Sequence, residues 1–298
     1  MTRVKTLISE TSTCAPAIHV HELEVTYGAV QAVRGIDFSV QPGEVFGFLG
    51  PNGAGKTSTI RVLLDLQRPT AGIASIHGVE VRTGGGGLRR ELGFLPGDLD
   101  LFPSLTGRET LDFFGRLYGL PTPKRSAVLD ALGFPESAMD RKVAEYSTGM
   151  RQMVGIALAF QHAPRLLILD EPTTGLDPLV RESFLGLVRE TAATGATVFM
   201  SSHVLSEVQD VADRVGLIHE GRMVGVDTIE NLRRGFPRRA ILRYEDGRTE
   251  SILDSGSPAD LLDRIPREGL VDIEIRPADL KDVFRSMVEG EDGGGLRE

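Results

Sequence analysis

The sequence predicts an α/β fold with a parallel sheet that is covered by helices and has an antiparallel edge. Unbroken apolar runs at Val45–Gly50 and Leu166–Asp170 are typical of parallel strands buried on both faces. Segments with helical periodicity separate such runs, so strands alternate with helices along the chain. Directly after the first run, Gly50–Thr57 matches the pattern GxxxxGK[ST], which indicates a phosphate-binding loop between a strand and a helix.

Residues 18–230 form the predicted main unit, preceded by a leader at residues 1–17 that we expect to be disordered. Its first strand, Ile18–Val25, alternates apolar and polar residues, as a half-buried strand does. Further along we expect a loop at the four glycines Gly84–Gly87. The other elements expected around the sheet are the helices Thr59–Gln67, Pro178–Ala192 and His203–Ala212 and the strand Ala196–Ser202.

The middle of the chain is more helical than its surroundings. Helical patterns at Thr106–Gly119, Ser126–Leu132 and Ser147–His162 predict a helical subdomain at about residues 98–162. Beyond the main unit, short strand and helix patterns predict a small α+β domain at residues 235–289, and glycine-rich residues 290–298 predict a flexible tail.

Composition narrows the class of function. The chain has 298 residues, of which 41% are hydrophobic, enough to bury a sizeable core. Its net charge of −9 argues against a dedicated nucleic-acid partner. The single cysteine, Cys14, suits a reducing compartment. No apolar run approaches the length needed to cross a bilayer, so any role at a membrane would be exerted from the cytosolic side through a partner.

The phosphate-loop residues suit ATP with Mg²⁺. Glycines let backbone N–H groups wrap around phosphates, and the helix that follows adds positive partial charge. The Lys56 ammonium would neutralise the β- and γ-phosphates, and the Thr57 hydroxyl would ligate Mg²⁺. The predicted ATP-binding residues of the loop are Gly50, Pro51, Asn52, Gly53, Ala54, Gly55, Lys56, Thr57 and Ser58.

Two adjacent acids end the second apolar run. Asp170 is placed to hold Mg²⁺, and Glu171 could act as general base toward the attacking water. Adjacent acids at a strand end are by themselves more often a solvated turn. Together with the phosphate loop they predict a hydrolytic site.

The segment Tyr146–Gln152 resembles the signature motif of the nucleotide-binding subunits of ABC transporters, and it lies just ahead of the second acidic strand. Gly175-Leu176-Asp177 is similar to the D-loop of that family, and Ser201-Ser202-His203 to its switch histidine. Tyr27 precedes the phosphate loop where the family has an adenine-stacking aromatic, although a simple edge-strand aromatic is the alternative. The resemblance covers about residues 18–227.

The resemblance implies a dimer mechanism, with two copies or one copy and a relative. Two subunits would close head to tail on two ATP molecules, so that Ser147, Gly149 and Met150 of one subunit face the phosphate loop of the other. Asp177 would couple the two sites. His203 would act with Glu171 in catalysis, whereas the plainer interpretation is a residue at a helix start.

One position departs from the family pattern. Gly97 stands where the family has a glutamine that ligates Mg²⁺ and contacts the membrane partner. Asp98 or a water molecule would have to replace that ligand. The loop from Asp98 to Arg108 and the helix after it remain the expected docking surface for a membrane subunit.

Two segments, Thr148–Gln152 and Leu105–Glu109, resemble segments in the subunits of drug and small-molecule exporters. In those exporters the membrane part, the permease, is a separate chain. The resemblance therefore implies an ATP hydrolase on the cytoplasmic face of the cell membrane. The alternative is a soluble ABC ATPase in translation or DNA repair. Those proteins carry long coiled coils, zinc inserts or a second phosphate loop, none of which this sequence has. A regulator that binds nucleotide without hydrolysis fits poorly with Glu171 and His203 both present.

Overall fold

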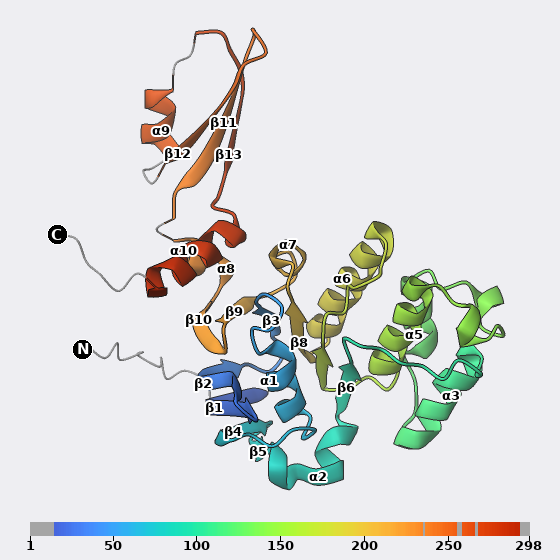
Figure 1. The fold of residues 1–298 in the computed structure, drawn as a ribbon. Helices are drawn as coiled ribbons and strands as arrows, with labels where there is room; N and C mark the ends of the chain where they lie inside the picture. The colour runs from blue at the N-terminus through green and yellow to red at the C-terminus, as the bar shows by residue number, and fades with distance from the viewer. Residues whose placement is uncertain (1–14, 235, 255–257, 266–267, 293–298) are drawn as a thin grey trace.

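The computed structural model describes residues 15–234, 236–254, 258–265 and 268–292. Most of the leader, including Cys14, and the end of the predicted tail therefore lie outside the described residues. Figure 1 shows a main body of sheets and helices, beside which stands a small sheet with its own helix. Nothing among the described helices is both long and apolar enough to cross a membrane.

The centre of the main body is a six-stranded sheet in the order β10-β9-β3-β8-β7-β6. All neighbouring pairs are parallel except β10 and β9, which are antiparallel. Strands β3, β7 and β8 are buried along their whole length, as their apolar sequences predict. The six strands are β3 (Val45–Leu49), β6 (Leu92–Leu95), β7 (Leu166–Leu169), β8 (Thr197–Ser202), β9 (Arg214–His219) and β10 (Arg222–Asp227).

A four-stranded antiparallel sheet forms one side of the body, in the order β2-β1-β4-β5. Phe38 from this sheet packs against Phe46, Phe48 and Phe199 of the central sheet, with ring centroids 5.4–5.9 Å apart. This aromatic layer joins the two sheets in one core. The four strands are β1 (Ile18–Tyr27), β2 (Val30–Val40), β4 (Ala71–Ile76) and β5 (Val79–Glu80).

Helices complete the body on the faces and at one side of the sheet. The helical subdomain contributes α3, which begins with a capping box at Thr106 and Glu109, and α5, whose buried face packs against β6 and α4. The helices are α1 (Lys56–Leu63), α2 (Val81–Arg90), α3 (Gly107–Tyr118), α4 (Arg125–Ala131), α5 (Thr148–Phe160), α6 (Pro178–Ala193), α7 (Leu205–Val208) and α8 (Ile229–Arg233), with short 3₁₀ turns at Glu136–Ala138 and Val143–Glu145.

The C-terminal part divides its apolar residues between two cores. Strands β11 (Arg238–Tyr244), β12 (Thr249–Asp254) and β13 (Leu270–Arg276) form an antiparallel sheet that packs with α9 (Pro258–Arg264) around Leu242 and Leu261. Helix α10 (Leu280–Asp292) instead places Leu280 and Val283 in the core of the main body, against α7, α8 and β10. A helix that follows the small sheet in the sequence thus contributes to the core of the main body.

Four predicted elements differ from the structure. The glycines Gly84–Gly87 lie inside α2 rather than in a loop, because a helix can tolerate them with a kink at Gly85, where φ is 55° and ψ is −150°. The helix expected at His203–Ala212 is only Leu205–Val208, and the one expected at Thr59–Gln67 runs from Lys56 to Leu63. Helix α10 continues to Asp292, into the predicted flexible tail.

Candidate active site

The glycine-rich loop between β3 and α1 forms the centre of the candidate site. Gly53 and Gly55 have φ values of 80° and 107°, a region that favours glycine. Gly50 has no room for a side chain, since a Cβ there would lie 2.2 Å from the Ile218 carbonyl oxygen. The loop lines a cavity of about 310 Å³ whose wall includes Tyr27, Ala32, Asn52, Gly53, Ala54, Gly55, Lys56, Thr57, Ser58 and Glu171.

Lys56 is held by its own loop. Its side chain is 6% exposed, and its Nζ donates hydrogen bonds to the carbonyl oxygens of Gly50 at 2.7 Å and Pro51 at 3.2 Å. The same ammonium forms an ion pair with Glu171 Oε1 at 3.2 Å. A buried charge is stable only when it is paired and hydrogen-bonded, and Lys56 meets both conditions within the site.

Asp170 meets Thr57 at the carboxyl end of β7. The Thr57 hydroxyl donates a hydrogen bond to Asp170 Oδ2 at 3.0 Å, and Ser201 Oγ donates to Oδ1 at 2.5 Å. Within the described part of the chain, no group of three or more His, Cys, Asp or Glu residues could hold a metal ion. A hydroxyl beside a carboxylate nevertheless fits Mg²⁺, which takes few protein ligands and keeps water and phosphate oxygens.

Glu171 lies between a cation and an imidazole. Its Oε1 contacts Lys56, and its Oε2 lies 2.6 Å from His203 Nδ1. Its φ of 49° is uncommon for a residue other than glycine. The backbone N–H of Glu171 donates to Ser201 Oγ at 3.0 Å, which helps to hold this strained backbone in place.

A second cavity, of about 410 Å³, adjoins the same carboxylates. Its wall includes Thr57, Asp98, Asp170, Glu171 and His203. Gly97 also lines it, and a Cβ at Gly97 would lie 3.5 Å from Asp170 Cγ. The structure therefore brings Asp98 to the predicted metal ligands, although no direct contact joins its side chain to theirs among the interactions of the described residues.

The signature segment lies elsewhere. Ser147 caps α5 by accepting a hydrogen bond from the Met150 N–H at 3.2 Å, and a Cβ at Gly149 would lie 3.1 Å from the Gly175 carbonyl oxygen. Asp177 caps α6. None of these five residues is among the described residues that line the two cavities, so one chain does not bring its signature segment to its own phosphate loop.

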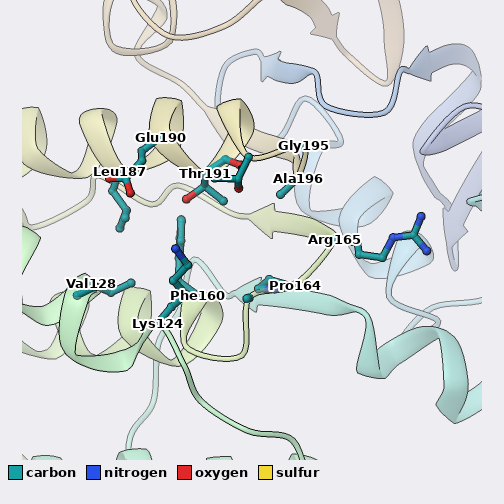
Figure 2. Close-up of a pocket in the computed structure, with 13 residues that line it drawn as sticks. Lys124, Val128, Phe160, Pro164, Arg165, Leu187, Glu190, Thr191, Gly195 and Ala196 are labelled. Carbon is teal, nitrogen blue, oxygen red and sulfur yellow. The ribbon is translucent and has the colours of Figure 1, made fainter.

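A third cavity, of about 430 Å³, lies at the opposite ends of β7 and β8. Figure 2 shows Leu187 of α6 facing Val128 of α4 across this space, while Arg165 points away. None of its lining residues is a predicted site residue. The candidate catalytic residues instead follow the carboxyl ends of β7 and β8, where ligands bind in open α/β sheets.

Sequence reasoning missed the role of Ser201 in linking the site. Its hydroxyl joins Asp170 and the Glu171 backbone, and its side chain is fully buried. The signal in the sequence for this role was the pair of serines that ends the strand before His203.

The role of Gln152 was also missed. Its buried amide donates a hydrogen bond to the Pro172 carbonyl oxygen at 2.8 Å and so connects the signature helix to the segment after Glu171.

Known proteins of one family are similar to this chain. Residues 33–174 match the family model described as "ABC transporter". The linearmycin resistance ATP-binding protein LnrL of Bacillus subtilis (strain 168) is 38% identical over 219 residues, which are 72% of this chain and 70% of the relative. The daunorubicin/doxorubicin resistance ATP-binding protein DrrA of Streptomyces peucetius is 36% identical over 240 residues, or 79% and 72% of the two chains.

Solved structures show the same fold. An ATP-binding subunit of an ABC transporter superposes with a TM-score of 0.68 at 32% identity, covering 73% of this chain and 92% of the other. A dimeric bacterial ABC transporter cassette superposes with a TM-score of 0.63 at 22% identity, covering 71% and 98%. The predicted α/β class, with an antiparallel edge and a helical subdomain, is confirmed.

Proposed function

Because this chain belongs to the ABC transporter family, as one of its ATP-binding proteins, we propose that it hydrolyses ATP to drive export of a small molecule through a separate membrane-spanning permease. Among its relatives are resistance proteins, which favours export over the soluble roles in translation or DNA repair. The observation that carries the proposal is the convergence of Lys56, Asp170, Glu171 and His203 on one phosphate loop.

The hydrolytic step follows from these contacts. A γ-phosphate in the loop would compete with Glu171 for the Lys56 ammonium and leave the carboxylate free to accept a proton. A water beside Glu171 would attack the γ-phosphorus, its proton would pass to the carboxylate, and the bond to the bridging oxygen would break, with the electron pair leaving on ADP. His203, at 2.6 Å from Glu171, would orient the water.

Mg²⁺ is the metal that these residues fit. When bound, it would neutralise charge that develops on the phosphate oxygens. Thr57 and Asp170 would hold it, with Asp98 as the candidate for the place of the missing glutamine. Tyr27 lines the loop cavity and is 38% exposed, so we propose that it stacks on adenine.

We propose that two ATP-binding subunits complete each other's sites. Ser147 and Gly149 lie at the start of α5, where backbone N–H groups attract an anion. Because these residues do not line their own subunit's ATP cavity, their use on phosphate requires a second subunit. Asp177 caps α6 two residues after Gly175, whose carbonyl oxygen lies close to Gly149, and this supports a role for Asp177 in coupling the two sites.

An exposed aromatic cluster supports docking on a permease. Phe102, Phe113 and Phe114 have ring centroids 5.3–6.4 Å apart, and Phe102 and Phe113 remain 50% and 45% exposed. Leu117, which lies on α3 together with Phe113 and Phe114, is 67% exposed. Exposed apolar clusters commonly mark interaction sites, so we propose that this face binds the permease at the cytoplasmic face of the cell membrane.

We also propose that the chain is organised as an ATPase unit at residues 18–230 and a small unit from about residue 235. The separate core around Leu242 supports a second unit. Helix α10 is the exception within residues 235–289, because its apolar face packs into the ATPase core.

Glu171→Gln tests the hydrolytic assignment. The variant should bind ATP but lose hydrolysis by about 10²-fold or more, because an amide cannot take the proton. The matched control is Glu182→Gln, which neutralises an exposed acid on α6 and should hydrolyse normally. Full activity of Glu171→Gln in a preparation where wild type is active would overturn the assignment of the base.

The permease interaction needs its own test. Purification of the tagged chain from its native membranes should recover a polytopic membrane protein, and Phe102→Asp should reduce that recovery while basal ATP hydrolysis persists. Recovery of ribosomes or DNA-repair factors in its place would contradict the transporter role.

A further inference from the structure

Glu207 makes two strong contacts from the short helix α7. Its Oε2 accepts a hydrogen bond from Thr173 Oγ1 at 2.5 Å, and its Oε1 forms an ion pair with Arg181 Nη1 at 2.7 Å. Its side chain is only 9% exposed. Both carboxylate oxygens are therefore engaged in a place that is nearly closed to water.

These contacts join the three segments that carry the proposed catalytic and coupling residues. Glu207 follows His203 by four residues, and Thr173 follows Glu171 by two. Arg181 lies in the first turns of α6, which begins at the Asp177 cap. One carboxylate thus connects the histidine segment (residues 203–208), the general-base segment (residues 170–173) and helix α6, which follows the D-loop.

The segment after His203 is held by apolar packing of Leu205 and Val208 in the main core and by the polar contacts of Glu207. Helix α7 comprises four residues and has no side-chain cap hydrogen bond, and a helix this short is not stable by itself. A nearly buried carboxylate is also costly unless it is fully paired, and an apolar side chain there would often serve stability as well. The pairing is therefore better explained by placement of the loops than by stability alone.

We propose that Glu207 is a positioning residue for ATP hydrolysis, which holds the His203 imidazole against the Glu171 carboxylate by anchoring α7 to Thr173 and Arg181. This inference rests on the proposed function, and it adds a residue that lines neither of the two cavities of the candidate site. Supporting residues of this kind typically alter activity by about 10- to 100-fold when they are removed.

Glu207→Ala removes both contacts, and Thr173→Val removes the hydrogen bond but keeps the size and neutrality of the side chain. Glu207→Ala should lower kcat for ATP hydrolysis by about tenfold, with KM for ATP changed by less than about twofold, because no phosphate-loop contact is altered. Thr173→Val should reduce kcat in the same direction. Glu182→Gln, which neutralises an exposed acid on α6, should match wild type.

A double variant separates positioning from general stability. In a His203→Ala background, Glu207→Ala should cost little further activity, because the group it positions is gone. An equal loss in both backgrounds, or a wild-type kcat in a folded Glu207→Ala chain, would overturn the proposal. If Glu207→Ala does not fold, Glu207→Gln is the variant to measure. A wild-type kcat in Glu207→Gln, at an unchanged Tm, would also overturn the proposal. Absence of hydrolysis in wild type would instead refute the proposed function.

Discussion

Substitution of Ser201 by alanine removes the hydroxyl that links the proposed metal ligand to the proposed base. Ser201 Oγ donates to Asp170 Oδ1 at 2.5 Å and accepts from the Glu171 N–H at 3.0 Å. The side chain is fully buried at the end of β8, so water has no ready access to replace it. The perturbation is therefore confined to two hydrogen bonds.

The magnitude follows from the two bonds. A hydrogen bond to a charged group contributes about 1.5–3 kcal/mol and a neutral one about 1 kcal/mol, so we expect a loss of about 3 kcal/mol in the free energy of unfolding. For a chain of this size that corresponds to a fall in Tm of about 6 °C. The backbone of Glu171, with its φ of 49°, would also lose its anchor, and a shift of the base should lower kcat by about tenfold or more.

The assay combines thermal unfolding with steady-state ATP hydrolysis. Thr197→Val is the matched control, because Thr197 is a buried hydroxyl at the other end of the same strand and accepts a hydrogen bond from the Gly43 N–H at 3.0 Å. It should lower stability by about 1 kcal/mol and leave kcat unchanged. A folded Ser201→Ala chain with wild-type kcat, or an equal loss of kcat in Thr197→Val, would refute the reasoning.

Three further predictions concern single side chains. Lys56→Ala should weaken ATP binding by about 10- to 100-fold, as judged by equilibrium titration, since it removes a charge-assisted contact; unchanged affinity would contradict the phosphate-loop assignment. Asp98→Asn should raise the Mg²⁺ concentration for half-maximal hydrolysis by about threefold or more; an unaltered requirement would exclude Asp98 as metal ligand. Burial lowers the pKa of His162 below its usual 6.5, so the folded state binds fewer protons than the unfolded state and stability falls as the pH drops through 6.5. His162→Gln should therefore show a smaller fall in Tm than wild type between about pH 8 and about pH 6, and an equal fall would refute this cause. Part of the fall should remain in the variant, because burial also lowers the pKa of His77.

Local patterns were sufficient wherever one segment decides its own structure. The apolar run at Leu166–Asp170 corresponds to β7, which ends at Leu169, because an unbroken apolar strand can be satisfied only by burial on both faces. The helix expected at Pro178–Ala192 matches α6, since proline at the first helical position and an aspartate cap define its start.

Local patterns failed where distant contacts decide. The helix expected at His203–Ala212 shortens to α7, whose Glu207 contacts Thr173 and Arg181 from elsewhere in the chain. The segment Gly84–Gly87 lies within α2, interrupted by the kink at Gly85, although glycine has a low helix propensity, because tertiary context can override that preference. Helix α10 joins the main core although the sequence places it after the small sheet.

The sequence alone determined the family resemblance, the α/β class, and the residue types that touch phosphate and metal, because these depend on spacing within short segments. Only the tertiary structure decided that Lys56 pairs with Glu171, that Ser201 links the two acids, and that Glu207 joins the histidine segment to α6. Each of these contacts joins segments that are far apart in the chain. Such pairs become neighbours only when the parallel strands align their carboxyl ends, and no periodicity in the sequence records that alignment.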